Sequence, residues 1–277
     1  MAKKKNRPEP ASLGLPCVGV ETHAHLDYDA NFEETLLDTI SRAHVAGVAR
    51  LGNVFLGPDK FNAHASAFND IDEVFFLLGV HPNDVVDEKR TAVADMATAF
   101  DRESRLVAVG EIGLDYYWDR SPQDLQKQFF REQLAFARER GVPAVIHSRD
   151  AFEDTITVLD DMNFRDHPLI WHCFNGDVTM AEAILERGWY ISIPGPVSYS
   201  KNTALANAAA TIPLERMLIE TDSPFLSPEP YRGKPNEPSY LVFTAQKIAM
   251  LREMETAELW RKTGQNAIDV FGLDPLT

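Results

Sequence analysis

Cysteine is scarce in this sequence, and long apolar segments are missing from it. Cys17 and Cys173 are the only cysteines among 277 residues, which excludes a disulfide framework and favours a reducing compartment. The densest apolar segment, residues 74–80, is far shorter than the ~18–20 residues that a membrane-spanning helix requires. No apolar segment follows the basic N-terminus, so we expect no secretory signal. These absences predict a cytoplasmic protein that does not interact with a membrane.

Positive charge is also in short supply. The sequence has 27 Lys and Arg residues against 42 Asp and Glu residues, a formal net charge of −15. An acidic molecule repels polyanions, which excludes a broad basic groove for nucleic acid but permits local contacts through metal ions and a few cations. Basic residues cluster at the start, at Lys3, Lys4, Lys5 and Arg7. We expect residues 1–15 to form a disordered basic tail and residues 16–277 to form one domain.

Short apolar segments alternate with segments of helical periodicity along the rest of the chain. One helical segment starts after Ser121 and Pro122, ends at Gly141, and carries Phe130 and Leu134 on one face. Eight such repeats favour a single α/β domain, a closed (β/α)8 TIM barrel. An open Rossmann-type sheet is disfavoured because no G-x-G-x-x-G follows the first strand. The expected strands are residues 17–25, 48–54, 74–80, 106–111, 144–147, 169–172, 189–193 and 217–220.

Residue types that bind metals concentrate at the ends of these expected strands. In a (β/α)8 barrel the C-terminal ends of the strands form the active-site face. Imidazole and carboxylate groups are ligands for Zn²⁺ and Mn²⁺, and carboxylates also suit Mg²⁺. Six donors exceed the need of one tetrahedral site, so we predict two divalent ions, Mg²⁺, Mn²⁺ or Zn²⁺, about 3.5–4 Å apart. The predicted ligands are His23, His25, Glu111, His147, His172 and Asp222.

The remaining histidines and the second cysteine are interpreted differently. His44 and His64 lie in helical segments, so we expect packing or surface roles for them. His167 precedes a proline at the opposite end of the barrel, and we assign it no role. His81 lies on the active-site face, where a functional and a structural role are equally open. Cys173 follows a predicted ligand and should point the other way along the strand, as a packed thiol.

Several motifs in this sequence resemble those of the TatD family of metal-dependent deoxyribonucleases, within the amidohydrolase-like barrel hydrolases. The matching segments are ETHAHLD, GVHP, GEIGLDYY, PAVIHSRDA, HCFNG, SIPGPVSYS, IETDSPFLSP and YRGKPNEP. They extend over residues 21–238, most of the chain. The resemblance implies a (β/α)8 barrel, divalent metal at the six residues named above, and nuclease activity on DNA or sometimes RNA. Glu21 departs from the family pattern, which usually has Asp at this position, and the ligands are untouched by that change.

Hydrolysis of a phosphodiester requires an activated water and neutralisation of charge on the phosphate. We expect Asp222 to orient and deprotonate this water, with Glu111 as the second catalytic carboxylate and Glu220 as the alternative to Asp222. Aromatic residues 116–118 are candidates for stacking on a base. The candidate substrate-binding residues are His81, Arg149 and Arg232.

The expected substrate is single-stranded DNA, with RNA as an open possibility, and the expected reaction is exonucleolytic. Two other functions remain open at this point. A metal-dependent hydrolase of ester or amide bonds, such as a D-aminoacyl-tRNA deacylase, would use the same ligand set. A catalytically silent binding or assembly factor would not need the ligand set intact, which argues against that class.

Overall fold

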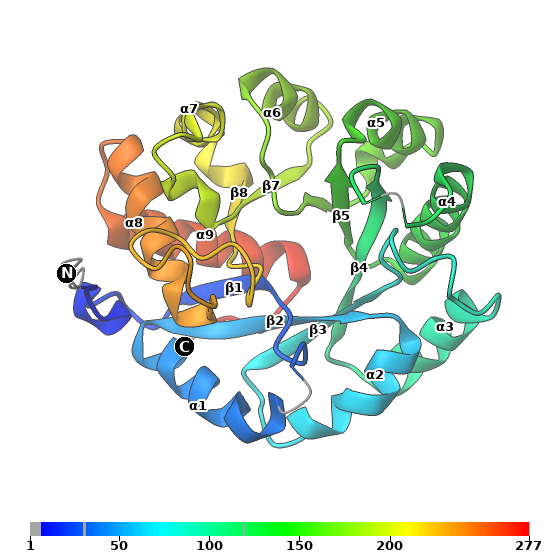
Figure 1. Ribbon diagram of the computed structural model, residues 1–277, viewed down its shortest axis with the longest axis horizontal. Helices are drawn as coiled ribbons and strands as arrows, with labels where there is room; N and C mark the ends of the chain where they lie inside the picture. The colour runs from blue at the N-terminus through cyan, green and yellow to red at the C-terminus, as the bar shows by residue number, and fades with distance from the viewer. Residues whose placement is uncertain (1–6, 30–31, 119, 277) are drawn as a thin grey trace.

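The protein is a (β/α)8 barrel, as the sequence predicts. The computed structural model describes residues 7–29, 32–118 and 120–276. Eight parallel strands lie in chain order around one sheet, and helices surround them (Figure 1). The strands are β1 Gly19–Ala24, β2 Val48–Leu56, β3 Val74–Gly79, β4 Leu106–Asp115, β5 Ala144–Arg149, β6 Leu169–Trp171, β7 Tyr190–Ile193 and β8 Met217–Ile219.

The helices follow the strands in the expected alternation. Helix α4 begins after Pro122 and ends at Gly141, whose φ of 68° is the left-handed conformation that glycine favours. Phe130 and Leu134 are buried on its inner face, as predicted. The helices are α1 Phe32–Val45, α2 Pro58–His64, α3 Ala92–Arg102, α4 Gln123–Arg140, α5 Phe152–Asp161, α6 Val178–Leu185, α7 Thr203–Thr211, α8 Leu241–Leu251 and α9 Thr256–Phe271.

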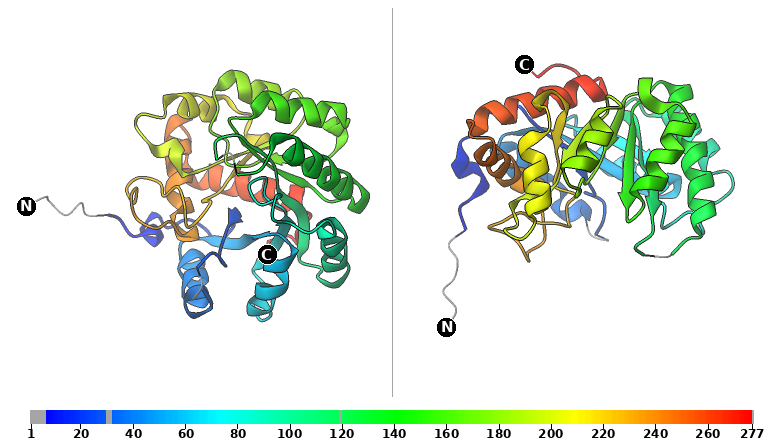
Figure 2. Two further views of the ribbon diagram at one scale, coloured as in Figure 1. Left: turned by 45° about the vertical axis from the view of Figure 1, so that its right-hand side comes forward. Right: turned by 90° about the horizontal axis from the view of Figure 1, so that it is seen from above.

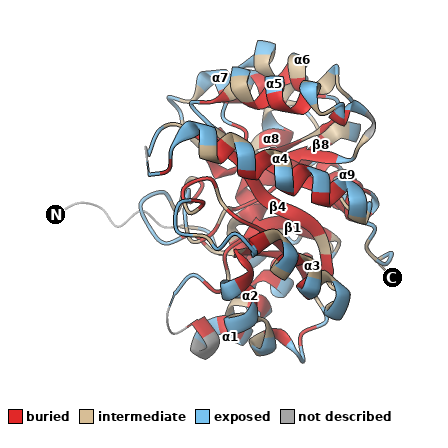
Figure 3. Cartoon of the chain, turned by 90° about the vertical axis from the view of Figure 1, so that its right-hand side faces the viewer, coloured by how far each residue is buried: buried red, intermediate tan, exposed pale blue. Residues whose placement is uncertain are grey.

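Two apolar layers hold the strands in place, one between sheet and helices and one inside the barrel. Figure 3 shows that the strands are mostly buried and that the outer faces of the helices are exposed. The inner layer takes residues such as Val20, Phe75 and Leu218 from different strands. Helix α9 contributes Phe271, whose ring centroid lies 5.1 Å from that of Phe75. Figure 2 shows α9 at the end of the barrel opposite to the loop that follows β8. Apolar packing therefore fills the N-terminal end of the barrel, and polar residues are left for the C-terminal end.

The barrel is nearly closed where the first strand approaches the segment that follows the last. A single parallel bridge pairs Ala24 with Ser223. The backbone N–H of His25 donates to the carbonyl of Ser223 at 2.8 Å, and that of Asp222 donates to the carbonyl of His23 at 2.9 Å. The end of β1, which carries His23 and His25, and the segment with Asp222 are thus fixed to each other by backbone hydrogen bonds.

The N-terminal segment differs from the expected tail. Residues 1–6 lie outside the described residues, but residues 7–15 are ordered, with a short 3-10 helix η1 at Pro10–Leu13. The side chain of Arg7 donates to the carbonyl of Pro230 at 2.9 Å, and the hydroxyl of Tyr231 donates to the carbonyl of Pro8 at 3.1 Å. These polar contacts attach Arg7 and Pro8 to the loop before α8, and the domain boundary at residue 15 stays a prediction. Over the described residues, the helices are too short or too polar to span a membrane.

Candidate metal centre

The structure brings all six predicted ligands together at the C-terminal end of the barrel. Strand β1 carries His23 and leads into His25, while β4 and β5 carry Glu111 and His147. His172 directly follows β6, and Asp222 lies three residues beyond the end of β8. Donor atoms of these residues form overlapping groups in which every pair lies within 4.8 Å. Residues from five different strands therefore share one site.

Glu111 lies at the middle of this site and faces the four histidines of the predicted ligand set. Its Oε1 atom lies 3.6 Å from Nε2 of His23 and 3.5 Å from Nε2 of His25. Its Oε2 atom lies 3.0 Å from Nδ1 of His147 and 3.2 Å from Nε2 of His172. Each carboxylate oxygen therefore belongs to a different pair of imidazoles, an arrangement in which one carboxylate can serve two ions.

Asp222 completes the site on the side of β1. Its Oδ1 atom lies 3.4 Å from Nε2 of His25, and its side chain is 14% exposed. The residue has a φ of 56°, a left-handed conformation that is uncommon outside glycine, asparagine and aspartate. This turn places the carboxylate at the barrel mouth, where it contacts His25 and remains accessible to solvent.

The charges in the site favour ionised carboxylates. Burial alone would raise the pKa of Glu111, but the imidazoles of His172, His81 and His147 together hold it well below its usual value. Burial opposes ionisation of Asp222 as well, yet its contact with His25 leaves the pKa of this carboxyl lowered. Both carboxylates are therefore available as anionic ligands at neutral pH.

The chemistry of the site fits a divalent metal ion. His23 is 1% exposed, and neither of its ring nitrogens has a hydrogen-bond partner. Leaving a buried polar group without a partner costs free energy, and a metal ion bound at the imidazole nitrogen removes this cost. The compact donor groups His23–His25–Glu111 and Glu111–His147–His172 are the nitrogen and oxygen sets that such ions take.

Outer carboxylates orient two of the histidines. The Oε1 atom of Glu220 lies 2.9 Å from Nδ1 of His172, and the Oδ2 atom of Asp115 lies 3.1 Å from Nε2 of His147. In each case the other ring nitrogen is the one that faces Glu111. Glu220 is thus placed to support the predicted metal ligand His172. This role differs from the deprotonation of water, for which Glu220 was the alternative to Asp222. Asp115 was not predicted as a site residue. Its position four residues after Glu111 in β4 could have indicated that it lies near the site.

Cys173 lies inside the site, contrary to the expectation that it points away. Strand β6 ends at Trp171, so strand alternation no longer applies two residues later. Cys173 has a φ of 47°, and its Sγ atom lies 3.9 Å from Oδ2 of Asp222. Burial raises the pKa of this thiol well above its usual value, which keeps the thiol neutral.

The three predicted substrate-binding residues lie at different depths. The Nε2 atom of His81 is 3.9 Å from Glu111, and Nδ1 accepts the backbone N–H of Asn83 at 3.1 Å. The proton of the neutral ring is therefore on Nε2, and burial lowers the pKa of His81 to about 3. Arg149 is exposed at the end of β5. Arg232 is exposed in the loop after β8, with its guanidinium 4.1 Å from the ring centroid of Tyr199.

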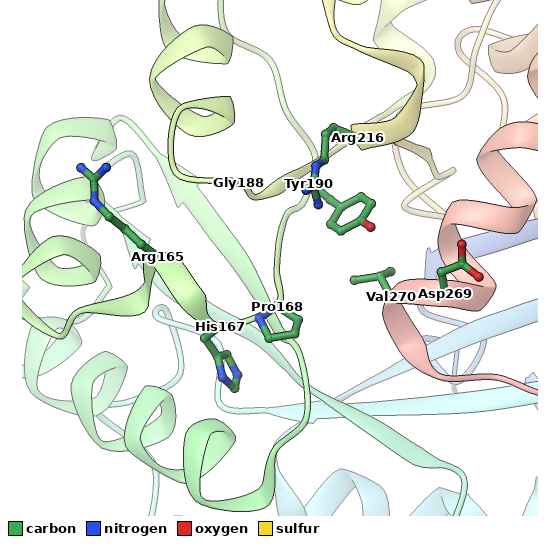
Figure 4. A pocket seen from close by; sticks show the side chains of 8 residues that line it. All are labelled: Arg165, His167, Pro168, Gly188, Tyr190, Arg216, Asp269 and Val270. Carbon is green, nitrogen blue, oxygen red and sulfur yellow. The ribbon is translucent and has the colours of Figure 1, made fainter.

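The remaining histidines lie away from the metal centre. The ring of His44 lies 3.6 Å from Sγ of Cys17, and Nδ1 of His64 lies 2.8 Å from a carboxylate oxygen of Asp27. His167 borders a pocket of about 360 Å³ at the N-terminal end of the strands, as expected for the opposite end of the barrel (Figure 4). The pocket is lined by Arg165, His167, Pro168, Gly188, Tyr190, Arg216, Asp269 and Val270.

Known proteins with similar sequences are described as metal-dependent hydrolases. The family model described as TatD related DNase matches residues 20–272. The chain is 38% identical over 257 residues to the metal-dependent hydrolase YabD of Bacillus subtilis, covering 92% of this chain and 99% of that one. It is 32% identical over 262 residues to the metal-dependent hydrolase TatD of Mycobacterium tuberculosis, covering 92% and 98%.

Solved structures give the same result for the fold. The crystal structure of YJJV, a TatD homologue from Escherichia coli, superposes with a TM-score of 0.87 at 25% identity and covers 93% of this chain and 99% of that one. A TatD family hydrolase from Entamoeba histolytica has the same fold, with a TM-score of 0.82 at 20% identity and coverage of 92% and 98%. The chain therefore belongs to the TatD family of metal-dependent hydrolases.

Proposed function

We propose that the protein hydrolyses phosphodiester bonds in single-stranded DNA, and in RNA as a second substrate to be tested, with two divalent ions. The observation that carries this proposal is the position of Glu111, whose two oxygens face separate pairs of histidines. A pair of ions held in this way suits displacement at phosphorus, because both the attacking and the leaving oxygen need charge stabilisation. The match to a family described as TatD related DNase supports the choice of a nucleic acid.

The protein side chains would divide the work around the reacting phosphate. His23, His25, His147 and His172 would hold the ions together with Glu111 and Asp222. When bound, such ions lower the pKa of water and neutralise charge on the phosphate. The Nε2–H group of His81 points toward the centre and can donate a hydrogen bond to a phosphate oxygen, as a neutral donor.

Asp222 is the residue that we assign to the attacking water. Of the two carboxylates among the predicted ligands, Asp222 is the one at the barrel mouth. It contacts His25 and is partly exposed to solvent. From this position it can accept a hydrogen bond from a water molecule and take its proton as the bond to phosphorus forms. Glu111 is more deeply buried, so we assign it to binding the ions rather than to activating the attacking water.

The substrate is expected to contact the protein over a small area. The net charge of −15 repels long polyanions, so the ions must supply most of the positive field at the scissile phosphate. Arg149 is exposed at the end of β5 and is a candidate for holding a flanking phosphate. Few phosphate contacts predict a shallow dependence of binding on salt, a slope of about −0.7 per contact for single strands.

The test is a cleavage assay on end-labelled single-stranded DNA and RNA with Mg²⁺, Mn²⁺ or Zn²⁺ added separately and with a chelator. We expect metal-dependent shortening of the strand. The cleavage rate should fall at least about 100-fold in Asp222→Asn and stay at the wild-type level in the exposed control Asp70→Asn. The proposal fails if no metal supports cleavage. If ester or D-aminoacyl-tRNA substrates turn over faster than DNA in the same preparation, the ester and amide hydrolase is the better assignment.

A further inference from the structure

Exposed aromatic side chains gather around the barrel mouth. Over the described residues, the exposed aromatics are Tyr28, Tyr117, Trp118 and Phe225, with exposed fractions between 42% and 55%. Each of them lies in a segment that follows β1, β4 or β8, so each lies on the same end of the barrel as the metal centre. Large apolar side chains left exposed together in this way mark a surface that binds something.

The first pair, which we name the β1–β8 platform, consists of Tyr28 and Phe225. Their ring centroids lie 5.0 Å apart at an interplanar angle of 81°. The ring of Phe225 also lies 6.2 Å from that of His25, edge to face. Edge-to-face contacts of this kind fix the rings without covering their outer faces. The platform therefore lies against the ring of His25, a predicted metal ligand.

The second pair, which we name the β4 platform, consists of Tyr117 and Trp118. Their ring centroids lie 5.0 Å apart at 90°, and the guanidinium of Arg149 lies 3.8 Å from the centroid of Tyr117. The backbone N–H groups of both aromatic residues donate to Oδ1 of Asp115. The other oxygen of Asp115 contacts His147, so this platform is attached to the opposite part of the metal centre.

The two platforms lie across the mouth from each other. Strands β1 and β8 are neighbours where the barrel closes, whereas β4 is separated from them by two strands on one side and three on the other. The metal centre, which takes ligands from β1, β4 and β5, lies between the platforms. A ligand that touches both platforms must pass over the metal centre.

We propose that a single-stranded nucleic acid crosses the mouth from one platform to the other, with a nucleobase stacked on each and the metal centre facing a phosphate between them. This inference rests on the proposed function. Stacking suits an acidic protein, because it supplies affinity without many phosphate contacts and tolerates every base. It also excludes duplex DNA as the preferred substrate, since paired bases present no free faces to the platforms.

The test compares two oligonucleotides with the same phosphates, a short oligothymidylate and its abasic counterpart, both with phosphorothioate linkages that resist cleavage. Fluorescence anisotropy measures their binding to the metal-loaded protein. We expect the wild type to prefer the base-bearing strand. Phe225→Ala and Trp118→Ala should each weaken its binding about 5- to 150-fold and leave abasic binding unchanged. Leu226→Ala, an exposed apolar neighbour of Phe225, is the matched control and should behave as wild type.

Two results would overturn the inference: no preference of the wild type for the base-bearing strand, or a preference that survives in the Phe225→Ala, Trp118→Ala double variant. Phe225→Trp keeps a stacking surface and should restore binding, which a merely structural role of Phe225 does not predict. The cleavage assay described above is a separate readout. Absence of metal-dependent cleavage would remove the proposed function, while the binding comparison would still decide whether bases stack on the platforms.

Discussion

Oε1 of Glu220 lies 2.9 Å from Nδ1 of His172, and both side chains are almost completely buried. This contact holds the imidazole so that Nε2 faces Glu111 at 3.2 Å. Burial alone would lower the pKa of His172, but Glu220 and Glu111 raise it well above its usual value. The negative charge of Glu220 beside Nδ1 therefore favours the ring position in which Nε2 faces the metal centre, and it makes that imidazole a stronger ligand.

Glu220→Gln is expected to weaken metal binding. The amide keeps the size of the side chain but removes the charge that orients and polarises His172, which typically costs about 10- to 100-fold in metal affinity. Titration calorimetry with Mn²⁺ or Zn²⁺ measures the change. Glu258→Gln, an exposed substitution on α9, is the control. An affinity for Glu220→Gln equal to that of the control would contradict the assigned role.

Glu21 joins the first and last strands, and its removal should destabilise the barrel. Its carboxyl oxygens accept the backbone N–H groups of His23 and Thr221 at 3.0–3.1 Å. Glu21→Ala leaves both buried donors without an acceptor, so we expect a loss of about 3 kcal/mol in the free energy of unfolding. Burial raises the pKa of Glu21 to about 8, so the neutral amide of Glu21→Gln should cost about 1 kcal/mol or less. Urea unfolding that shows equal losses for the two variants would refute this role.

Asp115 gives stability a defined dependence on pH. Burial would raise its pKa, but contacts with His147 and the Trp118 N–H lower the pKa to about 2, against about 4 in an unfolded chain. A lowered folded-state pKa stabilises the protein above pH 4, and the stabilisation is lost as the pH falls toward 2. The stability difference between wild type and Asp115→Asn should therefore shrink over this range. Denaturant unfolding at several pH values measures it, and a constant difference would count against the ion pair.

Gly113 allows β4 to pass close to β5 beside the metal centre. It has a φ of 144°, and a Cβ atom at this position would clash with the backbone carbonyl of His147, its partner in the sheet. Gly113→Ala should cost about 3 kcal/mol from strain and overpacking. Gly233→Ala also has a positive φ but has open space around it, so it should cost only about 1 kcal/mol. Thermal unfolding that ranks the two variants equally would show that close packing is not required here.

The fold and the convergence of the inner donor residues were predictable because both follow from local patterns. Continuous apolar segments such as residues 74–78 are buried as a parallel strand, and the residues that follow such strands must meet at one end of a barrel. The convergence of His23, Glu111 and His147 was predicted in this way. Their meeting needed no knowledge of side-chain conformation, only the order and direction of the strands.

Features that depend on loop conformation were not predictable in the same way. Cys173 turns into the site because the chain leaves the strand at Trp171 and takes a positive φ, which no alternation pattern reveals. Arg7 and Pro8 contact Tyr231, more than two hundred residues away in the chain. The extension of β4 to Asp115 placed an outer carboxylate where the sequence analysis had already ended the strand.

Metal analysis of purified protein tests the account most directly, because every functional argument depends on the six side chains holding ions around Glu111. After dialysis against Mn²⁺ or Zn²⁺, elemental analysis of the wild type should give two ions per chain. Glu111→Ala should bind fewer ions while keeping the far-UV circular dichroism of a folded barrel. A Glu111→Ala variant that retains the full metal content of the wild type would contradict the account.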